Sequence, residues 1–281
     1  MKTWKKIVLG VSLISLFLGG GLVAWGYSQG GLTDLQNQTK SEQDYVKKEV
    51  KDFNKIDIKS SSYNVLIKNG DVDKATLSYY QKTKNPIDTS VKDGQLTIND
   101  NNSELDSTSN KHINFFGLKD LVRLSTLNEE VRNKTIVITL PKKQTIDFLK
   151  VDLATGNLDL SNSTIKQADI NLNVGDLTFT KMIVSNLKAN LDVGSVDSNH
   201  TLFTNSDLSI AMGDYSGDNL IFNGHNKLDV TSGDIEIALK DYTLNVQADS
   251  HSGEVDITNN LKISKDNTLT ITSDLGDITV E

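Results

Sequence analysis

Seven glycines in the carboxyl-terminal half of the chain recur at a nearly constant interval. Each follows a small or apolar residue and precedes a polar one; they are Gly156, Gly175, Gly194, Gly213, Gly233, Gly253 and Gly276. The successive intervals are 19, 19, 19, 20, 20 and 23 residues. A period of this length indicates stacked supersecondary units, each of which buries its apolar side chains against its neighbours.

Apolar residues alternate with polar ones on both sides of these glycines. The apolar positions two and four residues after a glycine include Leu158 and Leu160, Leu177 and Phe179, and Ile235 and Ile237. Those five and three before it include Val151 and Leu153, Ile170 and Leu172, and Leu228 and Val230. Alternation with a period of two predicts two short strands that meet at a bend, where glycine allows torsions that a side chain forbids.

The repeat length restricts the fold to a coil of strands. A unit of about 19 residues is too short for a β-α-β module, which needs roughly 30 residues, and no helix-length apolar face is present. We therefore expect an all-β fold, a right-handed parallel β-helix (β-solenoid) with turns of about 19–20 residues. In such a coil each column of like residues becomes a ladder along the axis, and stability comes from stacking.

The charge and the lack of cysteine exclude several classes of function. The chain of 281 residues has a formal net charge of −8, and Lys2, Lys5 and Lys6 are the only charged residues before Asp34. The remainder therefore carries −11, which disfavours nucleic acid as a partner. Because the chain has no cysteine, it has neither disulfides nor a thiolate metal site nor a thiol nucleophile.

The amino terminus predicts a membrane anchor. No residue from Ile7 to Thr33 is charged, and the apolar run from Ile7 to Trp25 is long enough to cross a bilayer as a helix. Lysines precede it, so residues 1–27 read as a cytoplasmic stub and single transmembrane helix at the cell membrane, with an extracellular body. A cleaved signal peptide is the alternative, but Val23-Ala24-Trp25 lacks the usual small-x-small cleavage pattern.

Three further regions follow the anchor. Residues 28–52 are polar and predict a tether, with some helical character near Glu42 to Val50. Residues 53–281 form the predicted solenoid: irregular amino-terminal turns over 53–150, interrupted by an insertion at 99–134, and regular repeats over 151–281. The final turn, Leu269 to Glu281, has no capping helix after it. We expect it to present uncovered strand edges, which would meet a partner, another copy or the insertion.

The insertion carries apolar residues at mixed helical spacing, among them Phe115, Phe116, Leu118 and Leu121. One interpretation is an amphipathic element that contacts a membrane or a partner protein. The other is that it packs across a face or an open end of the coil, since large exposed apolar patches are uncommon.

The sequence gives only a weak signal for a catalytic or metal-binding site. The best set is the acidic column that follows the glycines, Asp176, Asp214, Asp234, Glu254 and Asp277, whose stacked carboxylates could bind calcium or act as acids. Asp is also a common turn residue at this position, and the double-glycine calcium nonapeptide is absent. The histidines do not share a column, and no nucleophile elbow or phosphate loop is present. We expect structural turn residues, no metal and no cofactor.

Several features together resemble a known family. They are the lysine-led anchor, an Ile-x-Ile-x-Ser-x-Ser-x-x-Val-x-Ile segment (Ile56 to Ile67), a strand ending in Leu-Pro (Ile136 to Pro141) and the serial Gly-Asp turns. This texture resembles the bacterial putative-adhesin β-solenoids, among them LiaG-like membrane-anchored proteins. The resemblance implies a non-enzymatic cell-envelope protein, associated with envelope stress or adhesion, whose partner is an envelope protein or cell-wall glycan. The alternatives are a surface adhesin or glycan-binding module, and a carbohydrate-active β-helix enzyme. The oligomeric state stays open.

Overall fold

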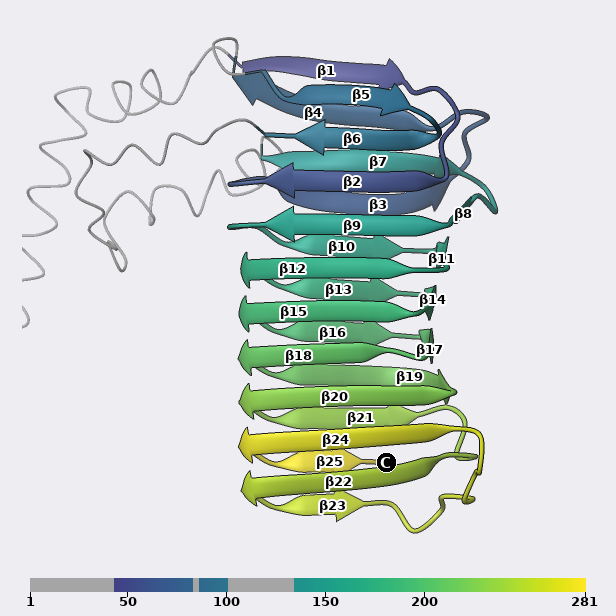
Figure 1. Ribbon diagram of the computed structural model, residues 1–281, viewed down its shortest axis with the longest axis vertical. Helices are drawn as coiled ribbons and strands as arrows, with labels where there is room; N and C mark the ends of the chain where they lie inside the picture. The colour runs from purple at the N-terminus through teal and green to yellow at the C-terminus, as the bar shows by residue number, and fades with distance from the viewer. Residues whose placement is uncertain (1–42, 83–85, 101–133) are drawn as a thin grey trace, which may run out of the picture. The chain divides into compact units, whose positions relative to one another are not determined.

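The computed structural model describes residues 43–82, 86–100 and 134–281, and residues 44–281 form one compact unit. All regular elements among these residues are β-strands, in two sheets of fifteen and ten strands (Figure 1). No helix among them is long and apolar enough to cross a membrane. The predicted anchor at 1–27 and the insertion residues Phe115, Phe116, Leu118 and Leu121 lie outside the described residues.

Each regular turn of the coil contains three strands and three corners. The strand before the turn glycine belongs to the ten-stranded sheet: β9 (Phe148–Leu153), β12 (Ala168–Val174), β15 (Leu187–Val193), β18 (Asp207–Met212), β20 (His225–Ser232), β22 (Asn245–Ser252) and β24 (Thr268–Leu275). The strand after it belongs to the fifteen-stranded sheet: β10 (Leu158–Ser161), β13 (Leu177–Thr180), β16 (Val196–Asn199), β19 (Tyr215–Asn223), β21 (Ile235–Leu239), β23 (Val255–Ile257) and β25 (Ile278–Val280).

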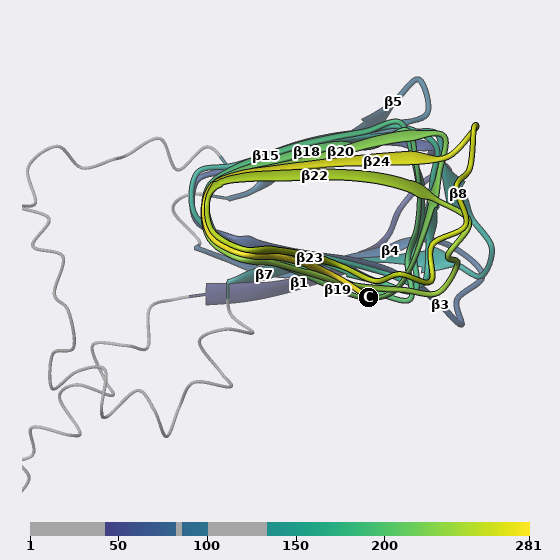
Figure 2. The ribbon, with the colours of Figure 1, turned by 90° about the horizontal axis from the view of Figure 1, so that it is seen from below.

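A third, short side closes the turn opposite the glycines. It contains β8 (Thr145–Ile146), β11 (Thr164–Ile165), β14 (Ile183–Ser185), β17 (Leu202–Thr204) and the second half of β19. Viewed along the coil, the two broad sheets face each other and the short side, marked by β8, joins them at one narrow end (Figure 2). The glycine corner joins them at the other. In Figure 1 the front strands run left and the rear strands run right as the chain descends, so the coil is right-handed.

Strands of successive turns pair in parallel without a register shift through the regular part. Leu158 lies opposite Leu177, and Ile170 lies opposite Ala189, so residues at equivalent repeat positions stack directly. Inward positions form one continuous core in which Phe179 and Phe203 meet edge to face at 5.3 Å between centroids. Phe203 and Phe222 stack at 5.8 Å. Phe203 and Phe222, each nine residues after a turn glycine, therefore line the core on the short side.

The turn glycines are required by stacking as well as by torsion. The φ values of Gly156, Gly175, Gly194, Gly213, Gly233 and Gly276 lie between 140° and 150°. A Cβ atom on Gly194 would lie 2.0 Å from the carbonyl oxygen of Gly175 in the preceding turn. Both the torsion and the close approach of one backbone to the next exclude a side chain.

The amino-terminal end does not stack in chain order. The strands concerned are β2 (Lys55–Ser60), β3 (Asn64–Gly70), β6 (Gln95–Asn99) and β7 (Thr135–Pro141). β2 pairs with both β9 and β6, and β3 pairs with both β10 and β7, so the first turn of the chain lies between the second turn and the regular repeats. Strands β4 (Thr76–Lys82) and β5 (Asp88–Lys92) run antiparallel to β7 and β6 and close this end.

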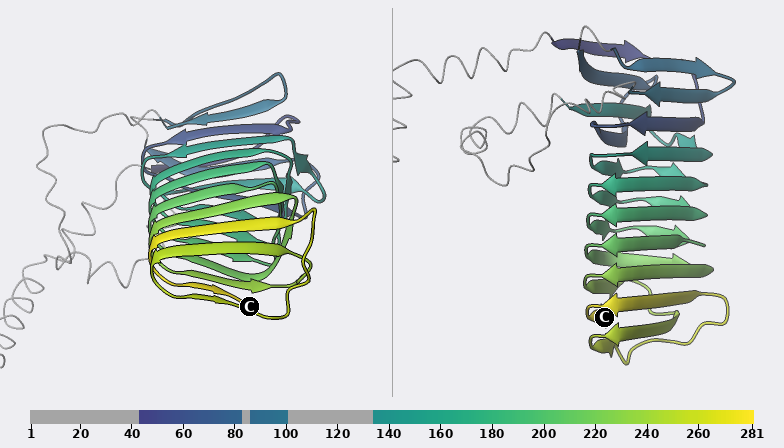
Figure 3. Two further views of the ribbon diagram at one scale, coloured as in Figure 1. Left: turned by 60° about the horizontal axis from the view of Figure 1, so that its bottom comes forward. Right: turned by 60° about the vertical axis from the view of Figure 1, so that its left-hand side comes forward.

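The carboxyl-terminal end repeats this arrangement. β24 pairs with β20 and β22, and β25 pairs with β21 and β23, so the last turn of the chain lies inside the one before it (Figures 1 and 3). The prediction that Leu269 to Glu281 forms an uncovered end is therefore wrong. The reason is burial, because Leu269, Ile271, Ile278 and Val280 are at most 1% exposed, whereas Val255 of the outermost turn is 42% exposed.

The predicted tether also needs correction. Residues 43–49 form strand β1 (Gln43–Glu49), which neighbours β4 at the end of the fifteen-stranded sheet. Val50 is buried and its amide donates a hydrogen bond to the carbonyl of Ala75 at 2.8 Å. The expected helical character near Glu42 to Val50 is wrong because the sheet edge offers this segment backbone partners and an apolar surface that an isolated tether lacks.

Candidate interaction surfaces

The acidic column after the glycines forms a hydrogen-bond relay along the coil. The amide of Asp176 donates to Oδ1 of Asn157 at 3.0 Å, and the amide of Asp234 donates to Oδ1 of Asp214 at 2.9 Å. The same contact recurs from the amide of Asp277 to Asp234 and from that of Glu254 to Asp277, at 2.9 and 2.8 Å. The side chains accept hydrogen bonds from the next turn, which gives each a structural role. No group of three or more His, Cys, Asp or Glu residues in the described part of the chain could hold a metal ion.

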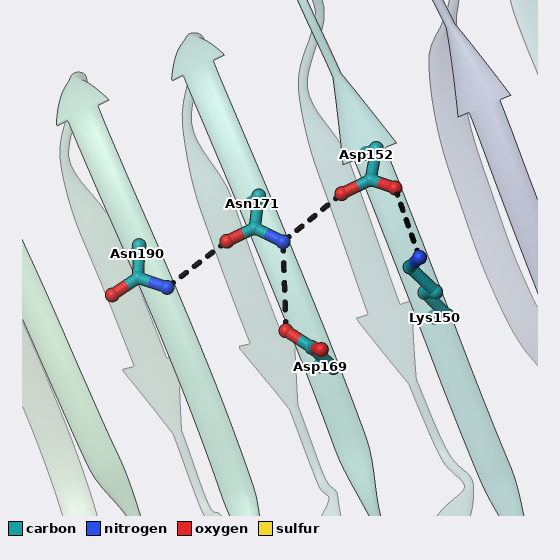
Figure 4. Close-up of polar contacts among 5 residues, drawn as sticks. All are labelled: Lys150, Asp152, Asp169, Asn171 and Asn190. Carbon is teal, nitrogen blue, oxygen red and sulfur yellow. Dashed lines mark hydrogen bonds and ion pairs between the residues drawn. The ribbon is translucent and has the colours of Figure 1, made fainter.

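The outer face of the ten-stranded sheet carries two polar ladders. In Figure 4, Nδ2 of Asn190 donates to Oδ1 of Asn171 at 2.9 Å, and Nδ2 of Asn171 donates to Oδ1 of Asp152 at 3.0 Å. Lys150 pairs with Asp152 at 3.6 Å, and Asp169 accepts a longer contact from Asn171 at 3.5 Å. These side chains lie on a broad, flat face and satisfy one another across the strands.

The neighbouring ladder alternates in charge. Two residues earlier in each strand, on the same face, the strand register places six residues of alternating charge in a single column: Asp57, Lys150, Asp169, Lys188, Asp207 and Lys227. Opposite charges directly across adjacent strands stabilise a sheet by about 0.2–1 kcal/mol per pair and oppose a slip of register. The pKa of Lys227 is raised, chiefly by its hydrogen bond to Asp229 and then by the charges of Asp229 and Asp207. This column is electrically balanced, with three Asp and three Lys.

The glycine edge, defined here as Val174, Val193, Met212 and Leu275, is different. Each residue directly precedes a turn glycine, and its side chain is 42–58% exposed. Val174, Val193 and Met212 lie on consecutive strands of the sheet. Ser232 occupies the next strand, between Met212 and Leu275. These four are half of the eight large apolar side chains that are exposed among the described residues. An exposed apolar line of this kind in a core-forming repeat indicates an interaction surface.

The charged residues around the glycine edge are all acidic. The segments from four residues before to five after the seven glycines contain 16 of the 37 acidic residues of the chain and no lysine or arginine. One of these carboxyls, Asp159, has its pKa raised, mainly by burial and further by the nearby charge of Asp176, and a hydrogen bond to Thr178 opposes this shift. The glycine edge is therefore an apolar ridge between acidic faces.

The short side presents the opposite combination. A shallow cavity of about 170 Å³ is lined by the apolar column Ile183, Leu202 and Ile221 and by the basic side chains of Lys181, His200 and Lys240. We call this the short-side groove. Lys181 and His200 sit at corners with φ of 54° and 51°, which turns both exposed side chains outward at the same repeat position. Ile183 is 48% exposed.

A family model described as Toastrack DUF4097 matches residues 53–281. The chain belongs to this family. Comparison with curated proteins gives no match.

Three solved structures are similar to this toastrack chain. A putative cell adhesion protein from Clostridium sporogenes is 16% identical, with 85% of this chain and 98% of that chain covered and a TM-score of 0.31. A putative adhesin from Bacteroides fragilis is 16% identical over 85% and 97%, with a TM-score of 0.36. A putative lipid binding protein from Parabacteroides distasonis is 10% identical over 84% and 96%, with a TM-score of 0.33.

The Ser-x-Ser segment of this toastrack coil replaces the glycine corner in its first turn. Oγ of Ser60 accepts a hydrogen bond from the amide of Tyr63 at 3.0 Å and donates to Oδ2 of Asp100 at 3.1 Å. A Cβ atom at position 156 would lie 2.4 Å from the carbonyl oxygen of Tyr63. Tyr63 therefore occupies, at the amino-terminal end of the column of turn glycines, the place that a glycine takes in the other turns. Sequence reasoning missed the role of Asp100, since nothing local links it to Ser60, forty residues earlier.

Sequence reasoning also missed both interaction surfaces. The residues directly before the glycines could have been found as a column, because Val174, Val193 and Met212 each extend the alternating apolar series of the strand by one position, up to the glycine. The histidines were correctly separated by repeat position, yet His200 does join Lys181 in one corner column. The structure brings together the glycines and the acidic column, and leaves His225 and His251 apart from the short-side groove.

Proposed function

We propose that this protein is a non-enzymatic scaffold or binding protein of the bacterial cell envelope. The observation that carries the proposal is the surface itself. The broad face of the ten-stranded sheet is covered by side chains that satisfy one another from turn to turn. The glycine edge exposes a column of large apolar residues, and the short side exposes Ile183 beside the half-buried Leu202 and Ile221. Such a rod offers straight, preformed surfaces for association, and residues 43–82, 86–100 and 134–281 contain no cluster in which acids, bases and nucleophiles converge.

Anchoring follows from the uncharged run at Ile7 to Trp25 and the lysines before it. We infer that the coil lies outside the cell and that the amino terminus is cytoplasmic. Protease added to intact cells, after removal of the cell wall under osmotic support, should digest an epitope at the carboxyl terminus and spare one at the amino terminus. Recovery of the full-length chain in the soluble cytosol would contradict this placement.

The binding role has its own test. Full-length protein carrying Val193→Asp should recover fewer envelope components after chemical crosslinking in cells than the natural chain, because a charge replaces an exposed apolar contact. Asn190→Asp places the same charge on the broad outer face of the same strand, β15, and serves as the control. Equal recovery with both variants would contradict a role for the narrow sides.

The family resemblance also favours a role in envelope stress, and deletion of the gene should then alter survival under wall-active agents.

Glycan binding is the second candidate, and the ladder in Figure 4 is the observation that favours it. Amide and carboxylate groups of Asp152, Asn171 and Asn190 repeat at one strand-spacing on a flat face, and they could hydrogen-bond a polymer of hydroxylated sugars. Binding to cell-wall glycan that is lost in Asn171→Ala but kept in Val193→Asp would favour this candidate over the first.

A further inference from the structure

The two exposed apolar columns occupy the same three turns of the coil. Val174, Val193 and Met212 are paired in consecutive strands, and so are Ile183, Leu202 and Ile221. Each member of the first column lies nine residues before its counterpart in the second. The columns therefore lie on opposite narrow sides of the cross-section, one at the glycine corner and the other on the short side, which β8 marks in Figure 2.

The two columns are complementary in charge. The glycine edge lies within segments that have 16 acidic residues and no lysine or arginine. The short-side groove is bordered by Lys181 and Lys240, together with His200. Asp241, beside Lys240, is the only acidic residue from six to ten positions after the turn glycines 156, 175, 194, 213 and 233. An acidic apolar surface and a basic apolar surface attract each other and each disfavours its own kind.

They are also complementary in form and in repeat. The glycine edge is a line of side chains that project from a corner, and the short-side groove is a cavity of about 170 Å³. Because both columns follow the same ladder, their side chains recur at the same strand spacing of about 4.8 Å. A ridge on one coil can therefore meet the groove of another at three successive turns.

We propose that copies of this chain associate side by side with parallel axes, the glycine edge of one copy seated in the short-side groove of the next. The contact is heterologous, so one copy of a pair keeps an unused groove and the other an unused ridge, and the association extends into rows. The apolar columns supply burial and the flanking charges supply orientation. The contact is small, so each pairing is weak and gains strength where copies are concentrated, as on a membrane surface. The inference concerns the chain's own copies and does not require a glycan ligand.

The lack of cysteine in the natural chain allows a direct test by site-specific crosslinking. Full-length chains carrying Val193→Cys and, separately, Leu202→Cys are produced together in cells, distinguished by different epitopes, and treated with a short thiol-reactive crosslinker. We expect the mixed dimer to exceed either homodimer several-fold. A single chain carrying both substitutions should form a ladder of multimers, because the two sites lie on opposite narrow sides of one coil and cannot join within it.

Val174→Cys with Ile183→Cys provides a second pair one turn away and guards against a local folding defect. Lys181→Glu combined with Lys240→Glu should lower the mixed dimer about tenfold. The control is Lys92→Glu combined with Lys265→Glu, which makes the same change in net charge at exposed positions away from the groove. Addition of 1 M salt should weaken the mixed dimer, because it screens exposed charges.

Three results would overturn the proposal. The first is no mixed dimer from either pair in chains that melt like the natural protein. The second is a predominance of homodimers, which would indicate a symmetric contact. The third is capture of both cysteines by a different envelope protein, with no product between copies.

Discussion

At the scale of single residues, the corners of the coil decide which amino acids the repeat accepts. The glycine corner combines φ near 145° with a carbonyl about 2 Å from the missing Cβ. The other two corners need only the left-handed helical region, and they use Asn162, Asn219, Asn186 and Asn205 with φ between 47° and 58°. Asn visits that region more readily than most residues, so it can replace glycine at these two corners and not at the first.

This difference predicts opposite outcomes for one substitution at two glycines. Gly213→Asn should lower the free energy of unfolding by about 3 kcal/mol or more, since it combines a strained torsion with a backbone overlap. Gly224→Asn should cost about 1 kcal/mol or less, because φ there is 66° and the nearest atom is the side-chain oxygen of Asn205, which can rotate. Urea denaturation of both variants measures the contrast, and equal losses would contradict the account.

Two buried phenols predict a loss of stability in alkali. Burial, assisted by the charge of Asp100, raises the pKa of Tyr63 to about 12, and burial also raises the pKa of Tyr215. In the unfolded chain both titrate near 10, so the unfolded state loses these protons first as pH rises. Their contribution is therefore complete below pH 10 and falls above it, for Tyr63 between about pH 10 and 12. Thermal melts from pH 9 to 11.5 should show a smaller decline for Tyr63→Phe than for the natural chain, whereas an equal decline would argue that lysines alone are responsible.

At the scale of elements, a turn is joined to the next through side chains as well as through strand ladders. Asp234 accepts from the amide of Asp277, and its own amide donates to Asp214. Asp277 and Asp234 are 43 residues apart in the chain but lie in adjacent turns. The series of hydrogen bonds therefore follows the order of the turns in space. The column's carboxylates matter here as hydrogen-bond acceptors.

The acceptor role can be separated from the charge. Asp234→Ala should lower the free energy of unfolding by about 1 kcal/mol, because the amide of Asp277 loses its partner. Asp234→Asn keeps an oxygen in place and should be close to the natural chain. Thermal or urea unfolding distinguishes the two, and a loss in Asn as large as that in Ala would indicate that the negative charge itself is needed.

The regular turns could be predicted from the sequence because each signal is local. Glycine spacing and alternation on both sides determine the strands β9 to β21, and the parallel coil follows from the repeat length. The two asparagine corners were predictable in principle, since Asn186 and Asn205 also recur at the period. The order of the end turns was not, because Gly253 and Gly276 carry the same pattern and only the depth of burial decides which lies inside. The interaction surfaces were missed because exposure of Val193 or Ile183 depends on the neighbouring corner rather than on the strand.

At the scale of the whole described unit, the two ends of the coil are finished differently. Antiparallel strands close the amino-terminal end, where Leu77 and Tyr79 are at most 3% exposed. The other end presents β22 and β23, each paired with one strand, and it carries Asp249, Glu254 and Asp256 on the outermost turn. Charged residues on such an edge discourage uncontrolled pairing with another strand.

Hydrogen exchange should report this order of turns. Amides of β24 and β25 are covered on both sides and should exchange more slowly than those of β22 and β23, which precede them in the chain. Mass spectrometry of peptides spanning 268–280 and 245–257 measures the difference. Faster exchange in the later peptide would contradict the inward position of the last turn. Peptides of β13 and β16 provide the fully stacked reference.

The inward position of the end turns also limits how such a rod can change length over evolution. In the turns of β13 and β16 every layer contacts only the layers that adjoin it in the sequence, so duplication of one 19-residue segment there adds a turn without disturbing any other. Past Gly233 this freedom ends, since the glycine of one layer rests on another 43 residues away. Taller and shorter relatives are therefore expected to differ in the middle and to share both finished ends.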